Sequence, residues 1–301
     1  MLITDQLYYY FNYYRSIYQY DDPLKNLRVP LVQEYIQPYA PKGVVSQHIH
    51  EIVASFLVYQ SLFTISRLFV KFAYPKFYNS LKPKTRIDFS IHIVSFVQSL
   101  LILILCIPLF KNPHLQQDHV FASTPYGQMV VSVAVGYFIW DALTCLLYIK
   151  YFGVEFFLHG VVSALVFLVG LSPAPVIMYY APIFLLFEVS TPFLNIRWLA
   201  IKFPTWISDT VKLINNIILI LLFFLIRICW GWYQVFRLAN DFYGARGDPR
   251  LNWFNVGVIL GSNLVLDLLN FYWFGKMLTV AINTLRKMFG AKADDRKLNL
   301  M

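Results

Sequence analysis

The chain has 301 residues, of which 58% are hydrophobic and only 14% are Asp, Glu, Lys or Arg. These proportions exclude an ordinary water-soluble domain and predict a polytopic membrane protein. The formal net charge is +9 at pH 7. Because no compact basic domain carries this charge, we attribute it to loops that face anionic lipid headgroups, and we expect no nucleic-acid partner.

Residues 1–44 are expected to form an arm that precedes the membrane domain. The arm lacks the apolar core of a secretory signal peptide, so the first span is expected to target the chain. Its aromatic side chains are typical of a membrane interface, and a role in gating a substrate is the alternative. These residues are Tyr8, Tyr9, Tyr10, Phe11, Tyr13, Tyr14, Tyr18 and Tyr20.

His48, His50 and Glu51 stand together just before the first long apolar run. Two histidines only two positions apart, with no further donor in register, favour a polar cap at the membrane interface over a zinc site. We therefore predict no metal. The three cysteines fall inside apolar runs, where a thiol acts as a small hydrophobic group. They are Cys106, Cys145 and Cys229.

Apolar runs of roughly membrane-spanning length predict about seven transmembrane helices in an all-α bundle. The fourth run is short and the fifth is interrupted by prolines, so six to eight spans remain possible. We assign 45–288 to one membrane domain and 289–301 to a basic cytosolic tail. The predicted spans are 52–70, 89–110, 127–149, 156–171, 176–198, 213–233 and 253–279.

Lys and Arg residues are retained on the cytosolic side of membrane proteins, so loop charge predicts orientation. With seven spans, one side receives 71–88, 150–155, 199–212 and the C-terminal tail, and most of the basic residues lie there. The sequence therefore predicts a lumenal N-terminus and a cytosolic C-terminus.

Polar residues recur at helical spacing within four of the predicted spans, and each set lies on one helix face. Four polar faces predict a shared interior, although such residues also join helices through hydrogen bonds. The sets are Asp88, His92, Ser95 and Ser99; Tyr137, Asp141, Thr144 and Tyr148; Glu155, His159 and Ser163; and Asn263, Asp267 and Asn270.

The fifth predicted span contains Glu188 between Pro182 and Pro192. A charged side chain at the bilayer centre costs at least about 2.5–3.5 kcal/mol, so Glu188 should face the protein interior or a wet cavity. Each proline removes a backbone donor and bends or breaks a helix. The segment is therefore predicted to be a bent helix that lines an internal site.

Asp141 and Asp267 each need a cation, a set of donors, water or a proton at such a depth. Arg227 on the sixth span is the predicted counter-ion, and a structural Asp–Arg pair is the simpler interpretation. The alternative hypothesis is that one of these aspartates and Arg227 together grip a lipid headgroup or an acyl-CoA phosphate.

Several short motifs carry a resemblance to a known family. They are Trp140-Asp141, Phe156-Phe157-Leu158-His159, Glu188-Val-Ser-Thr-Pro-Phe-Leu-Asn-Ile-Arg-Trp198, Phe223-Phe-Leu-Ile-Arg227 and Val265-Leu-Asp267-Leu-Leu-Asn270. Over residues 45–288 the chain resembles the TLC domain of ceramide synthases and translocating-chain-associated proteins. It is most similar to the uncharacterised fungal TLC-domain proteins. The resemblance implies a protein of the endoplasmic reticulum or Golgi, with spans around a cavity open to lipid, and a role in lipid and sphingolipid homeostasis.

In ceramide synthases two adjacent histidines are tied to acyl transfer from acyl-CoA to a sphingoid amine. His159 matches the first histidine, but Gly160 stands at the second. A single imidazole can act as a base for the amine. With two histidines, one can transfer the proton while the other provides orientation, and a single histidine lacks this second partner. An acyltransferase is thus the alternative to a lipid-binding protein, and acyl-CoA is expected only in that case. A lipid or proton-coupled transporter is a second alternative, although no internal repeat is visible.

Our interpretation is a TLC-type membrane protein that binds or senses membrane lipid, with no cofactor and with a protein partner or homodimer left open. The candidate catalytic residues are His159 and Asp141. The predicted ligand cavity is lined by Asp141, His159, Glu188, Asn195, Arg197, Arg227, Asp267 and Asn270.

Overall fold

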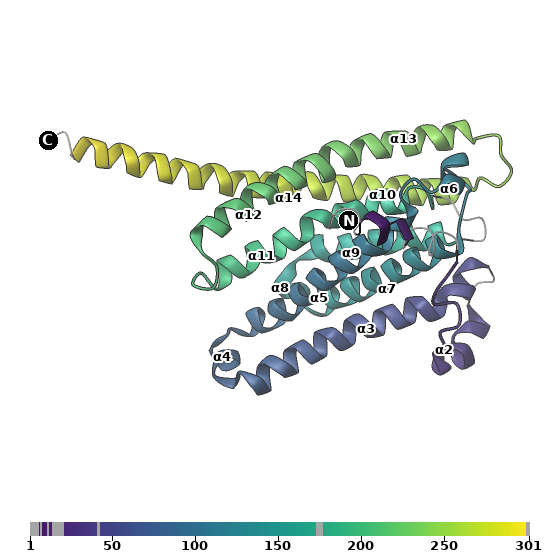
Figure 1. The fold of residues 1–301 in the computed structure, drawn as a ribbon, viewed down its shortest axis with the longest axis horizontal. Helices are drawn as coiled ribbons and strands as arrows, with labels where there is room; N and C mark the ends of the chain where they lie inside the picture. The colour runs from purple at the N-terminus through teal and green to yellow at the C-terminus, as the bar shows by residue number, and fades with distance from the viewer. Residues whose placement is uncertain are drawn as a thin grey trace.

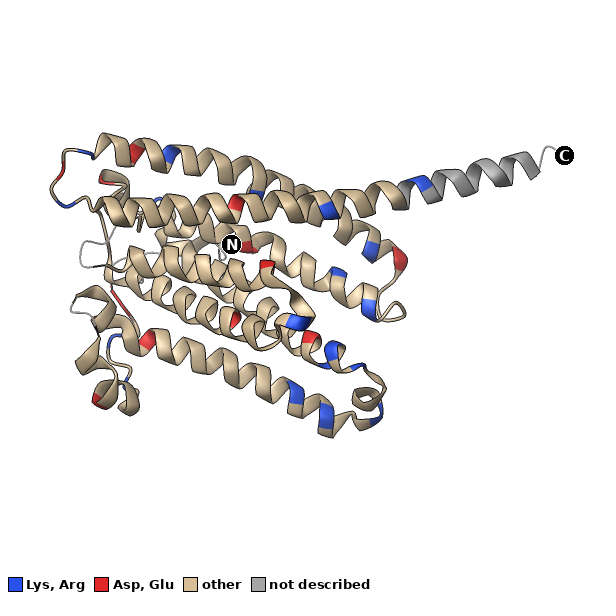
Figure 2. Ribbon diagram, turned by 180° about the vertical axis from the view of Figure 1, so that it is seen from behind, with Lys and Arg blue, Asp and Glu red and all other residues tan. Residues whose placement is uncertain are grey.

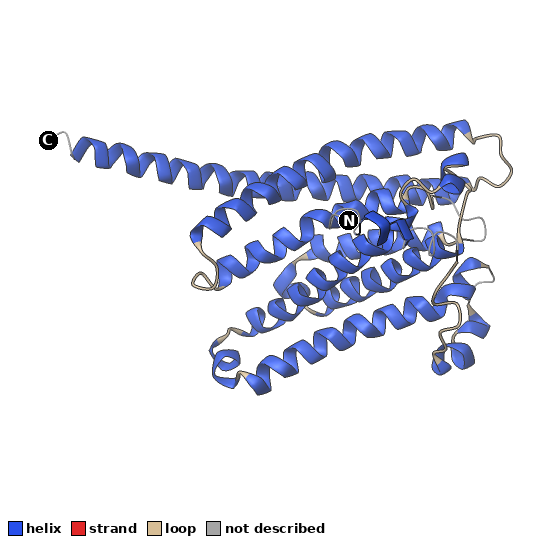
Figure 3. Cartoon of the chain, viewed as in Figure 1, coloured by secondary structure: helices blue, strands red, loops and turns tan. Residues whose placement is uncertain are grey.

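A computed structural model describes residues 6, 8–10, 12–13, 21–40, 43–172 and 177–298, with side chains described as far as Asn283 and at Arg286. These residues form helices and loops without a strand (Figure 3). The predicted all-α membrane fold is confirmed. Four of the N-terminal aromatic residues, Phe11, Tyr14, Tyr18 and Tyr20, lie outside the described residues. Tyr8, Tyr9, Tyr10 and Tyr13 are exposed.

The long helices run back and forth between the two ends of one bundle (Figure 1). They are α3 (Val44–Ala73), α5 (Pro83–Cys106), α7 (Pro125–Leu147), α9 (Val154–Gly170), α11 (Thr191–Lys202), α12 (Asp209–Leu222), α13 (Gly231–Gly244) and α14 (Trp253–Leu298). Shorter elements join or interrupt them. These are α2 (Pro30–Tyr35), η1 (Gln37–Tyr39), α4 (Pro75–Ser80), η2 (Ile107–Leu109), α6 (Pro113–Gln117), α8 (Ile149–Phe152), α10 (Ala181–Leu185), η3 (Leu186–Ser190) and η4 (Phe223–Trp230).

Six helical segments among the described residues are long and apolar enough to cross a membrane. The predicted span 156–171 corresponds to α9, which has 17 residues and is the shorter apolar helix. At 1.5 Å per residue it is about 25 Å long, slightly less than the roughly 30 Å of a hydrocarbon core. It nevertheless runs antiparallel to α7 along the bundle (Figure 1).

Helix α7 lies at the centre of the bundle, and 72% of its most apolar stretch is buried. It begins at Pro125, and Thr124 accepts a hydrogen bond from the Gly127 amide, which caps the first turn. Gly136 allows α3 to approach α7 closely, because a Cβ atom there would lie 2.4 Å from the Ile52 carbonyl oxygen. Small residues let membrane helices pack at short range without an aqueous hydrophobic effect.

The predicted break in the fifth span is confirmed. The segment is divided into α10, a 3-10 turn η3 and α11, with Pro182 and Pro192 each near a helical start. The sixth span is longer than predicted, because the helix continues through α13 to Gly244. An apolar run ends at the first charged residues, such as Arg237. An amphipathic helix can continue past them, with Leu238 and Phe242 buried on its other face.

Lys and Arg residues gather at the end of the bundle that carries α4, α8 and the turn between α11 and α12 (Figure 2). The arm before α3 joins the bundle at the opposite end, and α14 extends beyond the basic end (Figure 1). The start of α3 and the end of α14 therefore lie at opposite ends of the bundle (Figure 1).

Candidate functional site

Arg227 lies in η4, a π-helical segment inside the continuous helix that runs from α12 to α13. Wider turns of this kind are rare and occur often at functional sites. The guanidinium is buried, and its Nε donates to the Phe187 carbonyl oxygen at 3.1 Å and to Ser190 Oγ at 3.0 Å. Nη2 donates to Thr191 Oγ1 at 3.1 Å, and Nη1 to Asn270 Oδ1 at 3.5 Å. The side chain thus joins η4, η3, α11 and α14.

Most of these acceptors come from the irregular fifth segment. The 3-10 turn η3 leads directly into Thr191 and Pro192 at the start of α11. Proline lacks an amide donor, so backbone carbonyls in the preceding turn lose helical partners. In a membrane such groups must be satisfied inside the protein. Arg227 supplies a further donor to this segment at the Phe187 carbonyl, which also accepts from Ser190 Oγ.

Glu188 is the anionic partner of Arg227. Its Oε1 lies 3.8 Å from Arg227 Nη2, and both side chains are about nine-tenths buried. This corrects the predicted pairing, because among the described residues neither Asp141 nor Asp267 forms an ion pair with Arg227. A paired cation and anion are close to neutral together, which reduces the penalty for burying both.

A cavity of about 30 Å³ adjoins this ion pair, enough for roughly one or two water molecules. Most of its wall is apolar and consists of Phe, Leu and Val side chains from α7, α9, α10, η3 and α14. The polar residues that line it are His159, Ser163, Glu188, Arg227, Asn263 and Asn270. Four of the eight predicted residues, His159, Glu188, Arg227 and Asn270, are therefore brought together.

The two aspartates of the predicted set do not line the cavity. Asp141 on α7 accepts a hydrogen bond from Cys145 Sγ at 3.9 Å, one turn later on the same helix. Asp267 on α14 is 1% exposed, and its Oδ2 atom has no hydrogen-bond partner among the described residues. It packs close to Gly231 at the start of α13.

The remaining two predicted residues act elsewhere in the bundle. The Oδ1 atom of Asn195 on α11 lies 2.5 Å from His92 Nδ1, and its Nδ2 atom donates to Ser95 Oγ. Both contacts join α11 to α5. Arg197 donates to Asn216 Oδ1 at 2.7 Å, which joins α11 to α12. Sequence spacing alone assigned these residues to the same interior because it does not reveal which helix each face meets.

His159 lines the cavity, and its Nδ1 atom is buried without a hydrogen-bond partner among the described residues. The ring packs edge to face against Phe138 and Trp273. The next residue, Gly160, lies where α9 crosses α7. A Cβ atom there would lie 2.8 Å from the Ala142 backbone nitrogen and 2.9 Å from its Cα. A second histidine cannot occupy this position without separating the two helices.

Comparison with known proteins agrees with this architecture. The TLC domain matches residues 88–279, which contain all eight predicted site residues. The chain belongs to the TLC domain family. An uncharacterized TLC domain-containing protein of Saccharomyces cerevisiae is 38% identical over 224 residues, covering 71% of this chain and 68% of that protein. The family predicted from the sequence motifs is thereby confirmed.

Two further relatives carry the TLC domain resemblance across fungi and vertebrates. Topoisomerase I damage affected protein 4 of Saccharomyces cerevisiae is 32% identical and covers 79% of this chain and 86% of that protein. TLC domain-containing protein 4 of Homo sapiens is 28% identical and covers 81% of this chain and 93% of that protein. No solved structure matches the chain. Because the TLC domain matches residues 88–279, Arg227 and Glu188 lie inside it. Asp22, His48 and Glu51 come before the matched residues.

Proposed function

We propose that this TLC-domain protein binds a membrane lipid at the Glu188–Arg227 cavity and contributes to membrane lipid homeostasis. The observation that supports this most is the buried ion pair beside a largely apolar cavity that several polar side chains also line. Ionisable residues within membrane spans are expensive to bury and usually mark a functional pathway or site.

The charge of the site favours one class of lipid. Glu188 already neutralises Arg227, so a free phosphate would add an uncompensated negative charge to a buried position. A hydroxyl or amide group would instead accept or donate at Asn270 and His159 without that penalty. We therefore infer a neutral lipid with hydroxyl and amide groups, and ceramide-like sphingolipids are the first class to test.

Binding requires the bundle to open, because the cavity holds only about one or two water molecules. The α9–α14 seam is the route we infer. There the Phe156 and Trp273 rings stack with their centroids 5.4 Å apart, and the His159 ring packs edge to face against the same tryptophan. The exposed Phe156 side chain at this seam supports entry from the surrounding membrane.

Photolabelling tests this assignment. A photoactivatable ceramide added to the purified protein in lipid nanodiscs is expected to label cavity residues on α9 and α14, and excess ceramide is expected to compete. Phosphatidate should compete poorly. Labelling confined to outward side chains such as Leu57, Ile65 and Ile217, with no competition by ceramide, would contradict the proposal.

An acyltransferase is the second candidate, and His159 is the observation that favours it. Its unpartnered Nδ1 atom borders the cavity, where a base could act. Two observations weigh against it: Asp141 accepts a hydrogen bond from Cys145, and Gly160 leaves no room for a second histidine.

For the location of the protein, we propose the endoplasmic reticulum or Golgi. The basic end of the bundle would face the cytosol, because Lys and Arg residues gather there (Figure 2).

A further inference from the structure

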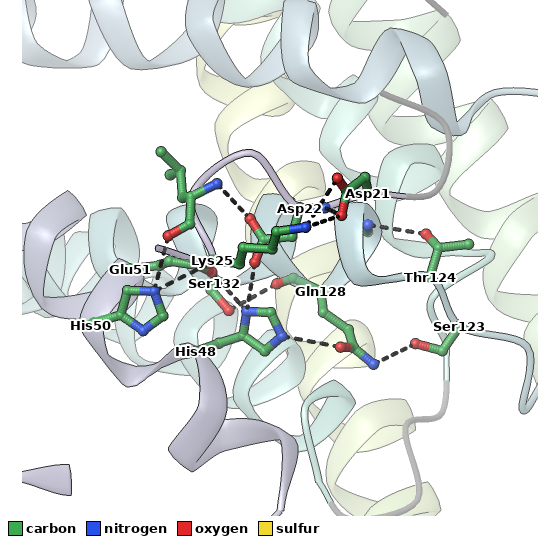
Figure 4. A network of polar contacts seen from close by, with 12 residues as sticks. Asp21, Asp22, Lys25, His48, His50, Glu51, Ser123, Thr124, Gln128 and Ser132 are labelled. Carbon is green, nitrogen blue, oxygen red and sulfur yellow. Dashed lines mark hydrogen bonds and ion pairs between the residues drawn. The ribbon is translucent and has the colours of Figure 1, made fainter. Parts of the chain in front are cut away.

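A second polar cluster lies where the arm meets α3 and α7 (Figure 4). The start of α3 is at the opposite end of the bundle from the basic loops (Figures 1 and 2). It contains Asp22 from the arm and His48 and Glu51 from the first turns of α3. The three side chains are almost completely buried, with exposures of 4%, 5% and 1%. Sequence reasoning missed Asp22 because it lies far from the histidines along the chain.

The donor atoms of this cluster converge on one point. His48 and Glu51 stand three residues apart and therefore share one face of α3. His48 Nδ1 lies 2.9 Å from Glu51 Oε2 and 3.9 Å from Asp22 Oδ2. One donor atom from each residue lies within 4.8 Å of the others. The ligand atoms of a tetrahedral zinc ion are about 3.3 Å apart, given metal–ligand bonds of about 2.0–2.2 Å.

Neighbouring contacts orient each donor toward that point. Gln128 Nε2 donates to Ser123 Oγ, so the Gln128 Oε1 atom faces His48 Nε2 at 3.0 Å. In a metal-bound form Nε2 would carry the proton and donate to Gln128, and Nδ1 would face the metal and the carboxylates. Metal-binding histidines characteristically use the second ring nitrogen in this way. Asp22 Oδ1 accepts from the Leu24 amide at 2.7 Å, and its Oδ2 atom is the one directed at His48.

With a neutral His48, the cluster holds two carboxylates and no cation. Asp22 and Glu51 supply two carboxylates, whereas Lys25, the nearest basic residue in the arm, forms an exposed ion pair with Asp21 instead. His50 Nε2 lies 3.7 Å from Glu51 Oε1 and 3.2 Å from the Leu24 carbonyl oxygen. Glu51 Oε1, although buried, has no hydrogen-bond partner among the described residues. Buried carboxylates are normally paired or bound to a metal.

We propose that Asp22, His48 and Glu51 bind a divalent metal ion of the zinc class. Two carboxylates and a neutral imidazole match the oxygen and nitrogen ligands that zinc accepts, and the +2 charge balances both acids. The ion fixes the arm to the start of α3 and, through Gln128, to α7. It is thus a structural site outside the residues matched by the TLC domain.

Metal analysis of the purified full-length protein tests this site directly. We expect about one zinc ion per chain in protein prepared without chelators. Asp22→Asn and Glu51→Gln keep the size and polarity of each side chain but remove its charge, and each is expected to lose the metal. His114→Gln is the matched control, because His114 is exposed near the same end of the bundle and should retain the metal.

A second measurement does not depend on any variant folding. Wild-type protein is stripped with a chelator, and its thermal unfolding is followed while zinc chloride is added. A ligand that binds only the folded state raises the melting temperature with its concentration. We expect Tm to fall on stripping and to recover with zinc but not with magnesium. Protein that contains no divalent metal and whose Tm does not respond to zinc would overturn the proposal. So would full metal retention in folded Asp22→Asn.

Discussion

Arg227 Nη2 lies 3.8 Å from Glu188 Oε1. Glu188 belongs to the 3-10 turn η3, the only irregular turn within the described span 181–202. Arg227 belongs to the π-helical turn η4, the only irregular turn within the described span 209–244. The Phe187 carbonyl in the 3-10 turn accepts from Arg227. The π-helical turn displaces Arg227 from the regular helical position. The ion pair and the backbone irregularities are therefore parts of one arrangement.

Breaking this pair should destabilise the protein more than removing it altogether. Arg227→Met leaves Glu188 buried without a cation, and such uncompensated charges cost about 3–5 kcal/mol. The Arg227→Met/Glu188→Gln double variant removes both charges and should be closer to wild type in the free energy of unfolding. Denaturation in detergent measures the difference. Arg67→Met is the control, since Arg67 contacts Phe63 outside the cavity. Equal losses in the single and double variants would contradict the pairing.

Gly160 should tolerate no side chain. Gly160→His is expected to lower the free energy of unfolding by about 3 kcal/mol, because its Cβ atom would overlap the Ala142 backbone at the α7–α9 crossing. Ala142→Gly should not rescue it, since the nearest atoms are the backbone nitrogen and Cα rather than the Ala142 methyl group. Thermal unfolding and size-exclusion chromatography report both effects. A stable Gly160→His protein would show that the helices separate easily.

His159 distinguishes binding from catalysis. We expect purified wild-type protein to transfer no acyl group from acyl-CoA to a sphingoid amine at a rate above that of His159→Ala, because no second base accompanies the imidazole. The measurement is formation of N-acylated product by mass spectrometry, with both proteins checked for folding. Turnover by wild type that disappears in His159→Ala would instead support the acyltransferase.

The termini should lie on opposite sides of the membrane. A glycosylation acceptor appended to the N-terminus is expected to be modified in the lumen, and one appended to the C-terminus is expected to remain unmodified. The reason is that Lys and Arg gather at the end of the bundle beyond which α14 extends (Figures 1 and 2). A shift in electrophoretic mobility after glycosidase treatment measures modification. Modification of the C-terminal acceptor alone would reverse the orientation.

The membrane fold was predictable because apolar length and proline position are properties of the local sequence. The break before α11 and the burial of Glu188 followed from Pro192 and from the cost of charge in lipid. The partner of Arg227 was not predictable. Helical spacing places Asp141, Glu188 and Asp267 on inward faces but does not say which face meets η4.

Long-range contacts account for the other differences. Asn195 and Arg197 share the segment of Glu188, yet α5 and α12 supply their partners. Asp22 joins the histidines of α3 only because the arm folds back onto that helix. The continuation of α13 past the apolar run reflects its amphipathic pattern, which a search for apolar length does not detect.

Mass spectrometry of co-purifying lipid tests the central claim most directly. Wild type and the charge-neutral Arg227→Met/Glu188→Gln variant would be extracted from the same membranes, with Arg67→Met as the control. We predict that wild type and the control are enriched in one neutral, hydroxyl- and amide-bearing lipid class and that the folded double variant loses this enrichment. If all three proteins carry the same bulk membrane lipids, the Glu188–Arg227 cavity does not bind lipid.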